Sequence, residues 1–146
     1  MSDREAGWVS ATVAPGGFRT AIDARTHALV ADEPTGAGGT DEGPTPYELL
    51  LGALAACTAM TVRMYADRKG WLLGDVTVRL RTAHAHAADC VSCETDPVGV
   101  GRLERELAFH GDLTDEQRAR LLEIANKCPV HKTLTGEIRI ESQLAR

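Results

Sequence analysis

The 146-residue sequence has few aromatic residues, no block of basic residues and no long apolar run, and each absence excludes a class of protein. Aromatic residues make up 4% of the chain, too few for a surface that stacks nucleic-acid bases. The net charge of −5 also argues against nucleic-acid binding. No apolar run approaches the ~18 residues of a membrane span, and residues 1–10 lack a signal-peptide pattern. We therefore expect a cytoplasmic protein that does not associate with membranes.

The remaining composition is that of an ordinary globular protein, with 43% apolar and 25% charged residues. A chain of this length can bury its own core, and it shows no internal repeat, so we expect a single domain over residues 1–146. Four cysteines in a cytosolic protein of this size favour metal ligands or redox groups over structural disulfides.

Local patterns predict strands and helices without a regular βαβ alternation. Strands are expected over residues 7–13, 18–23, 26–32, 75–82, 103–109 and 137–144, and helices over residues 46–69, 115–127 and 129–135. A glycine- and proline-rich loop covers residues 32–46. This order indicates an α+β fold.

The first expected helix is long and carries Cys57 near its middle. Thr45 fits its N-cap, with Glu48 at the third helical position of a capping box, and Gly70 closes the helix. Its first half is small and apolar, which indicates a central element that other parts of the fold cover closely. Glu48 is sufficiently explained by capping alone.

Two of the cysteines are candidates for thiol chemistry, which requires the thiolate. Cys128 precedes Pro129 and so lies at a helix N-terminus, where free N–H groups and the helix dipole favour a thiolate. Cys57 lies about three turns into its helix and would need a nearby cation instead. Taken singly, each cysteine fits core filling better than reactivity.

Two stretches, GPTPYELLLGALAACTAMTVRMYADRKGW and ARLLEIANKCPVHKTL, resemble the OsmC/Ohr family of organic hydroperoxide reductases. The resemblance implies an intertwined homodimer, with the long cysteine-bearing helices packed on antiparallel sheets from both subunits. It implies that Cys57 is the peroxidatic cysteine and Cys128 the resolving one. The implied activity is reduction of organic hydroperoxides without a required cofactor, with recycling by an external dithiol, in several members a lipoylated protein.

The sequence departs from the family at the residue that follows the helix-starting proline. The family pairs an activating arginine from the N-terminal strand region with a glutamate at that place, where this chain has Tyr47. Glu48 comes one residue later, a rotation of about 100° around the helix, so it cannot be assumed to fill the role. Arg19 is the best candidate for the activating cation, and Arg25 is its rival.

A second set of chemistry-bearing residues comprises His84, His86, Cys90 and Cys93. This set could bind one Zn²⁺, or Cys90 and Cys93 could form a redox pair, or the segment could be a polar loop. The resemblance gives no role for it. His131, one helical turn after Cys128, could assist proton transfer, although a surface histidine is the simpler interpretation.

The leading hypothesis is a thiol-dependent peroxidase that uses Cys57 and Cys128. Small apolar residues around Cys57 favour an alkyl or fatty acyl hydroperoxide as substrate. The alternative is a non-catalytic or weakly catalytic protein that binds an apolar ligand, with zinc at residues 84–93 as a stabilising element.

Overall fold

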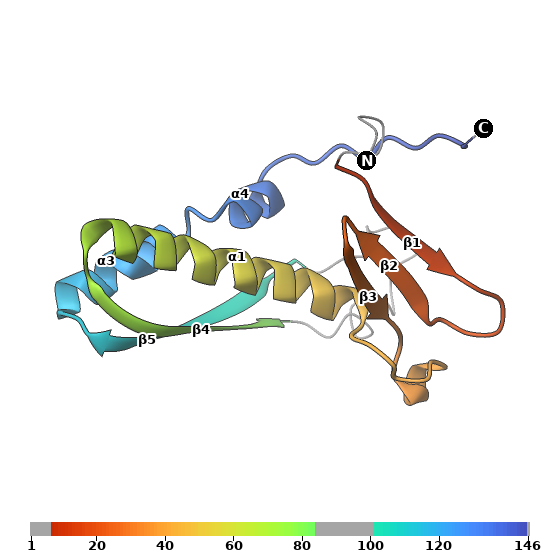
Figure 1. Ribbon diagram of the computed structural model, residues 1–146, viewed down its shortest axis with the longest axis horizontal. Coiled ribbons are helices and arrows are strands. Elements are labelled where there is room, and N and C mark those ends of the chain that lie inside the picture. The colour runs from red at the N-terminus through yellow and green to blue at the C-terminus, as the bar shows by residue number, and fades with distance from the viewer. Residues whose placement is uncertain (1–6, 84–100, 146) are drawn as a thin grey trace. The chain divides into compact units, whose positions relative to one another are not determined.

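The computed structural model describes residues 7–83 and 101–145 (Figure 1). The chain divides into two compact units, Met1–Leu50 and Leu51–Arg146, with the division inside the long helix. Each unit contains its own antiparallel sheet, and the mixed content confirms the α+β class. The single domain expected over residues 1–146 stays a prediction.

The first unit is built on a three-stranded antiparallel meander. Its strands are β1 (Val9–Val13), β2 (Thr20–Ala24) and β3 (His27–Ala31), in the order β1-β2-β3. Ile22 at the centre of β2 pairs with Ala11 on one side and Leu29 on the other. The three strands expected here are confirmed, with ends that differ by one or two residues.

The loop after β3 is organised by one carboxylate. Asp32 is 2% exposed, and its oxygens accept hydrogen bonds from the backbone N–H of Glu33, from both the N–H and the hydroxyl of Thr40, and from the N–H of Glu42. The hydrogen bond from the Thr40 hydroxyl lowers the pKa of Asp32 below its usual value, and the hydrogen bonds from the backbone amides lower it by a smaller amount. A short 3₁₀ helix, η1 (Thr35–Ala37), lies within the loop.

The long helix α1 (Pro46–Lys69) begins and ends where the sequence predicts. The Thr45 hydroxyl accepts the N–H of Glu48 at 3.2 Å, and the Glu48 carboxylate accepts the N–H of Thr45 at 3.3 Å. This is the reciprocal capping box. Gly70 follows with φ of 69°, the left-handed conformation that ends many helices and that glycine adopts most easily.

The second unit places α1 along a two-stranded hairpin (Figure 1). Its other elements are β4 (Leu72–Thr82), β5 (Leu103–Asp112), α3 (Asp115–Ala125) and α4 (Pro129–Thr135). β4 begins earlier and β5 ends later than expected, and a bulge interrupts their pairing between Leu73 and Val76. A second capping box, between Thr114 and Gln117, precedes α3, which starts at the expected residue 115.

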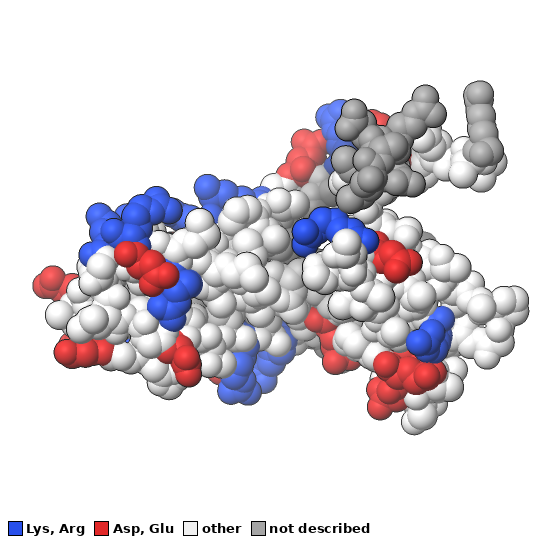
Figure 2. All heavy atoms as spheres, viewed as in Figure 1, with Lys and Arg blue, Asp and Glu red and all other residues white. Residues whose placement is uncertain are grey.

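The core of the second unit lies between α1, the hairpin and α3. Val62, Ala66, Leu73, Leu121 and Ala125 form one buried cluster. The opposite face of the hairpin is polar, and both signs of charge occur on the molecular face seen in Figure 2. One sheet face is therefore packed and the other faces water, as expected for an antiparallel hairpin.

α1 is buried along one stripe and exposed along another. The buried residues are Leu54, Thr58, Val62 and Ala66, whereas Met60 and Met64 are 64% and 61% exposed. The helix is long and apolar enough to cross a membrane by length and composition, a test that the core helix of a soluble protein also passes. Because Met60 and Met64 are exposed, the described residues of this single chain do not cover α1 on all sides.

The prediction of a strand over residues 137–144 is wrong for the described structure. No strand forms after α4 in residues 136–145. The alternating apolar residues Ile138, Ile140 and Leu144 are 52%, 88% and 95% exposed. A strand needs a neighbour for its backbone hydrogen bonds, and the described part of this chain offers none to this segment.

Candidate active site

The structure brings Cys57 and Cys128 together in the second unit. Cys57 lies in α1 and is partly exposed, whereas Cys128 is the N-cap of α4 and is fully buried. Both are free thiols, and they lie within hydrogen-bonding reach of each other. A pair of this kind, one thiol accessible and one enclosed, can form a disulfide if the first is oxidised.

The end of α3 and the start of α4 fix the Cys128 thiol. Asn126 is the C-cap of α3, and Pro129 takes the first position of α4, where its missing N–H costs no hydrogen bond. The Cys128 sulfur accepts the backbone N–H of His131 at 3.4 Å. The thiol therefore lies at the positive end of a helix.

The two thiols differ in acidity. Burial raises the pKa of Cys57, and its hydrogen bond to Cys128 raises that pKa further. Burial alone would also raise the pKa of Cys128, but hydrogen bonds from the Cys57 thiol, the His131 amide and the Thr58 hydroxyl outweigh it and lower the pKa below its usual value. Of the two thiols, Cys128 is therefore the one that loses its proton more readily.

A polar cluster joins the two cysteine-bearing segments. Arg105 of β5 donates from Nη1 to the Thr58 hydroxyl at 3.1 Å and from Nη2 to Oδ1 of Asn126 at 2.7 Å. Thr58 directly follows Cys57, and Asn126 is two residues before Cys128. One guanidinium group thus bridges α1 and the α3–α4 junction.

His131 lies beside this cluster and is half-buried. Burial lowers the pKa of its imidazole, and the positive charge of Arg105 lowers it further. The ring is therefore neutral at neutral pH, the state in which it can accept a proton.

Arg19 and Arg25 lie in the first unit. Nε of Arg19 pairs with Oε1 of Glu42 at 3.4 Å, and both side chains are about half exposed. The single hydroxyl proton of Thr40 is shared between Oδ2 of Asp32 and Oε2 of Glu42, each at 2.7 Å. Arg25 lies at the β2–β3 turn with φ of 57°. A carboxylate therefore does accompany Arg19, but it comes from the loop and not from the helix start.

The two residues at the start of α1 have different surroundings. Glu48 is engaged in the capping box, which supports the capping explanation of this residue. Tyr47 is 41% exposed. The expected metal ligands His84, His86, Cys90 and Cys93 lie outside the described residues. Within residues 7–83 and 101–145, no group of three or more His, Cys, Asp or Glu side chains is placed to hold a metal ion.

Sequence reasoning missed Arg105, Thr58, Asn126 and Glu42 as candidate site residues. The sequence did contain a sign of Arg105, because it shares one face of β5 with the apolar residues Leu103, Leu107 and Phe109. A charged residue in an inward-facing apolar row needs a polar partner. Thr58, Asn126 and Glu42 carry no comparable signal.

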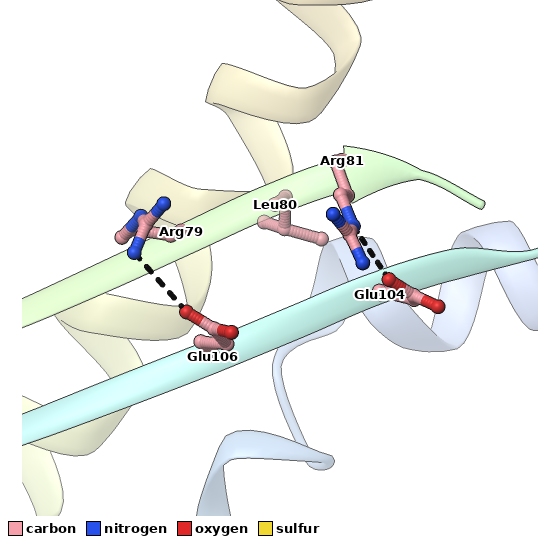
Figure 3. Close-up of a pocket in the computed structure, with 5 residues that line it drawn as sticks. All are labelled: Arg79, Leu80, Arg81, Glu104 and Glu106. Carbon is pink, nitrogen blue, oxygen red and sulfur yellow. Dashed lines mark hydrogen bonds and ion pairs between the residues drawn. The ribbon is translucent and has the colours of Figure 1, made fainter. Parts of the chain in front are cut away.

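A small hollow on the outer face of the hairpin lies apart from the thiols (Figure 3). It has a volume of about 90 Å³ and lies between two cross-strand ion pairs, Arg79–Glu106 at 3.2 Å and Arg81–Glu104 at 2.6 Å. Glu104 also pairs with Arg102 at 2.7 Å, so every charged side chain that lines the hollow already has an ion-pair partner. A larger cavity of about 370 Å³ in the first unit is lined by Phe18, Ala31 and Asp32, among others.

The model of the family described as OsmC-like protein matches residues 39–143. This match covers most of the chain and includes both cysteine-bearing segments. The chain belongs to the OsmC-like family. The predicted family and α+β fold are thereby confirmed.

Solved structures agree with this OsmC-like fold. An OsmC-like protein from Mycoplasma pneumoniae superposes with a TM-score of 0.73 at 17% identity, covering 88% of this chain and 86% of that one. An organic hydroperoxide resistance protein from Elizabethkingia anophelis gives a TM-score of 0.65 at 21% identity, covering 88% and 86%. The organic hydroperoxide resistance protein OsmC from Legionella pneumophila gives 0.59 at 19% identity, covering 88% of each chain. No curated protein matches this chain in sequence.

Proposed function

We propose that this OsmC-like protein is a cytoplasmic thiol-dependent peroxidase that reduces organic hydroperoxides. The observation that carries the proposal is the pairing of a partly exposed Cys57 with a fully buried Cys128 whose thiol sits at a helix N-terminus. Relatives described as organic hydroperoxide resistance proteins share the fold and support the choice of substrate class.

The chemistry proceeds in three balanced steps. The Cys57 sulfur takes the terminal oxygen of the hydroperoxide, the O–O bond breaks, and the alcohol leaves with the thiol proton. The Cys128 thiolate then attacks the Cys57 sulfenic acid, forms the disulfide and expels hydroxide. An external dithiol, such as a lipoylated protein, reduces the disulfide by exchange and is itself oxidised to a disulfide. No metal or organic cofactor takes part.

The exposure of the two cysteines supports this order of roles. A hydroperoxide can reach Cys57 but not a side chain with no exposed surface, so the enclosed Cys128 suits the second step. The raised pKa of Cys57 in the single chain means that a cation must favour its thiolate. We assign this role to Arg19, with Arg25 as the rival.

A homodimer is part of the proposal. Only 22% of the apolar window of α1 is buried within the chain, and Met60 and Met64 lie exposed on one stripe of it. The unpaired apolar segment at 137–144 also lacks a neighbouring strand in the described structure. A second copy would cover the helix and pair with this segment, as in the intertwined dimer that the family resemblance implies.

The test is rapid mixing of the reduced protein with cumene hydroperoxide, followed by site-resolved mass spectrometry of all four cysteines. Wild type should lose two thiols per chain, at Cys57 and Cys128. Cys57→Ser should lose none, and Cys128→Ser should stop at the sulfenic acid of Cys57. Equal turnover by both variants would overturn the assignment.

A second candidate function is non-catalytic binding of an apolar ligand. The raised pKa of Cys57 favours it, because a protonated thiol reacts slowly with peroxides. Under this alternative the wild-type protein keeps both thiols in the same mixing experiment, yet binds a fatty acid in an equilibrium titration.

A further inference from the structure

Arg105 is an unusual residue for its place in the sheet. It lies on β5 directly opposite Leu80 of β4, in the row that also holds Leu103 and Leu107 and that faces α1. The neighbouring arginines of the hairpin, Arg79 and Arg81, lie on the outer face and are 79% exposed. A guanidinium directed inward loses hydration, and only specific partners compensate for that loss.

The two partners of Arg105 flank the two cysteines in sequence. Nη1 reaches the hydroxyl of Thr58, the residue after Cys57, and Nη2 reaches Asn126, which ends α3 just before Cys128. The planar guanidinium fixes the directions of its two donors. This pair of hydrogen bonds from one guanidinium group, here called the fork, therefore fixes the distance between the helix that carries Cys57 and the junction that carries Cys128.

The contact with Thr58 also sets the direction of a hydrogen bond. Arginine can only donate, so its bond occupies a lone pair of the Thr58 oxygen and leaves the single hydroxyl proton for donation. That proton is donated to the Leu54 carbonyl at 2.7 Å, and the same hydroxyl lies close enough to the Cys128 sulfur to lower the pKa of that thiol. The Thr58 hydroxyl can therefore still donate its proton, to Leu54 or to Cys128.

We infer that Arg105 is a positioning residue that holds Cys128 beside Cys57, as a thiolate ready to attack the Cys57 sulfenic acid. This inference rests on the proposed function, and it assigns Arg105 to the second step, disulfide formation. In that step the new S–S bond forms, the S–O bond of the sulfenic acid breaks, and the oxygen leaves into solvent as hydroxide.

The other described ionisable groups near Cys128 do not supply this effect. Cys57 faces it from α1 and carries no positive charge, and His131 on α4 is neutral at neutral pH because burial and Arg105 lower its pKa. The adjacent Lys127 is exposed to solvent. Among the described residues, Arg105 is therefore the cation that is connected to Cys128 through a hydrogen-bonded neighbour, Thr58.

The first experiment measures the thiolate itself and needs no peroxidase activity. The absorbance of the Cys128 thiolate at 240 nm is followed against pH in the Cys57→Ser protein. The absorbance of the Cys57→Ser/Cys128→Ser protein is subtracted. Adding Arg105→Gln should shift the midpoint upward by about one pH unit. Arg105→Lys, which keeps the charge but not the fork, should shift it less. Arg79→Gln, which removes an exposed arginine from the neighbouring strand, should leave the midpoint unchanged.

The second experiment separates the two chemical steps by stopped flow with cumene hydroperoxide. In Arg105→Gln, sulfenic acid formation should stay within about twofold of wild type, while disulfide closure at neutral pH should slow about tenfold, following the shift of about one unit. Raising the pH should restore closure. An unchanged Cys128 midpoint, or equal slowing of both steps at every pH, would overturn the inference.

A misfolded variant and a failure of the proposed function can each be distinguished from a failure of this inference. If Arg105→Gln does not fold, Asn126→Ala removes one arm of the fork at an exposed residue, and it should slow closure without slowing sulfenic acid formation. An Asn126→Ala protein with wild-type closure would count against the fork. If wild type does not react with hydroperoxide, the proposed function fails, while the titration of Cys128 still decides the role of Arg105.

Discussion

Each of the two compact units contains an arginine site, and the two sites differ in how far burial and hydrogen bonds fix the arginine. Arg105 in the second unit donates to the fully buried Thr58 and to Asn126, next to an enclosed Cys128. Arg19 in the first unit is half exposed and pairs with an equally exposed Glu42. The first arrangement is fixed by packing, whereas the second is a surface ion pair of the kind that contributes little by itself.

This difference teaches that the two thiols depend on different parts of the molecule. The surroundings that lower the pKa of Cys128 lie within Leu51–Arg146. The same surroundings raise the pKa of Cys57. The lowered pKa of Cys128 is therefore a property of one unit, while the proposed activation of Cys57 needs a contribution that the described residues of this unit do not make.

The largest effect is expected from a charge on the exposed stripe of α1. Met60→Glu places a carboxylate where we expect the second copy, and burying an unpaired charge typically costs several kcal/mol, about 3–5 in measured cases. The variant should become monomeric at micromolar concentration by light scattering and lose turnover, while the Cys128 titration stays at its wild-type midpoint.

Leu122→Glu is the matched control for this variant. Leu122 is also an exposed apolar residue, at 52%, but it lies on α3 instead of α1. It should keep the dimer and the turnover. A wild-type protein that is already a stable monomer would contradict the dimer, because stability that depends on assembly also depends on concentration.

A smaller effect is expected from Arg19→Ala. A cation within about 4–6 Å typically lowers the pKa of a thiol by one unit or more, so its loss should slow alkylation of Cys57 at neutral pH about tenfold. Cys128 should titrate as in wild type. The measurement is site-resolved alkylation as a function of pH, with Arg25→Ala as the matched variant. If Arg25→Ala slows Cys57 and Arg19→Ala does not, the roles of the two arginines are exchanged.

The helix ends could be predicted from the sequence because their causes are local. The pairs Thr45–Glu48 and Thr114–Gln117 satisfy backbone groups within one turn, so three residues of spacing were enough to locate both helix starts. Gly70 likewise ends α1 through its own backbone conformation.

The missed features depend on partners distant in sequence. The apolar alternation of residues 137–144 predicted a strand, but a strand exists only where another backbone pairs with it. Arg105 was visible as a charge among apolar residues, yet its role follows from Thr58 and Asn126, which are 47 and 21 residues away. The expectation that Cys57 and Cys128 act together came from the family resemblance, since no local pattern relates them.

A further prediction concerns the loop that presents Glu42. Asp32 has a folded pKa below its unfolded value, so its hydrogen bonds stabilise the protein above the unfolded pKa, near pH 3.8, and that stabilisation is lost as pH falls through the folded pKa. Asp32→Asn should therefore lower the denaturation midpoint at pH 7, and the difference from wild type should shrink below about pH 4. Asp23→Asn on β2, an exposed carboxylate of the same unit, should change neither. A difference that persists unchanged at low pH would exclude the carboxylate as its cause.

The smallest effect is expected from Glu42→Gln. Its ion pair with Arg19 joins two half-exposed side chains at 3.4 Å, and exposed pairs typically contribute about 0.2–1 kcal/mol, less at high salt. The Thr40 hydroxyl that orients Glu42 can equally bond to the glutamine oxygen, so the loop should keep its shape. Alkylation of Cys57 should slow by less than about threefold at low ionic strength, and the difference should vanish in 1 M salt, where the Debye length is about 3 Å. If Glu42→Gln instead matched Arg19→Ala at both salt concentrations, the loop carboxylate would be as essential as the arginine it holds. The Arg19 site would then depend on its hydrogen-bonding partner as much as the Arg105 site does. The two sites would no longer differ in this respect.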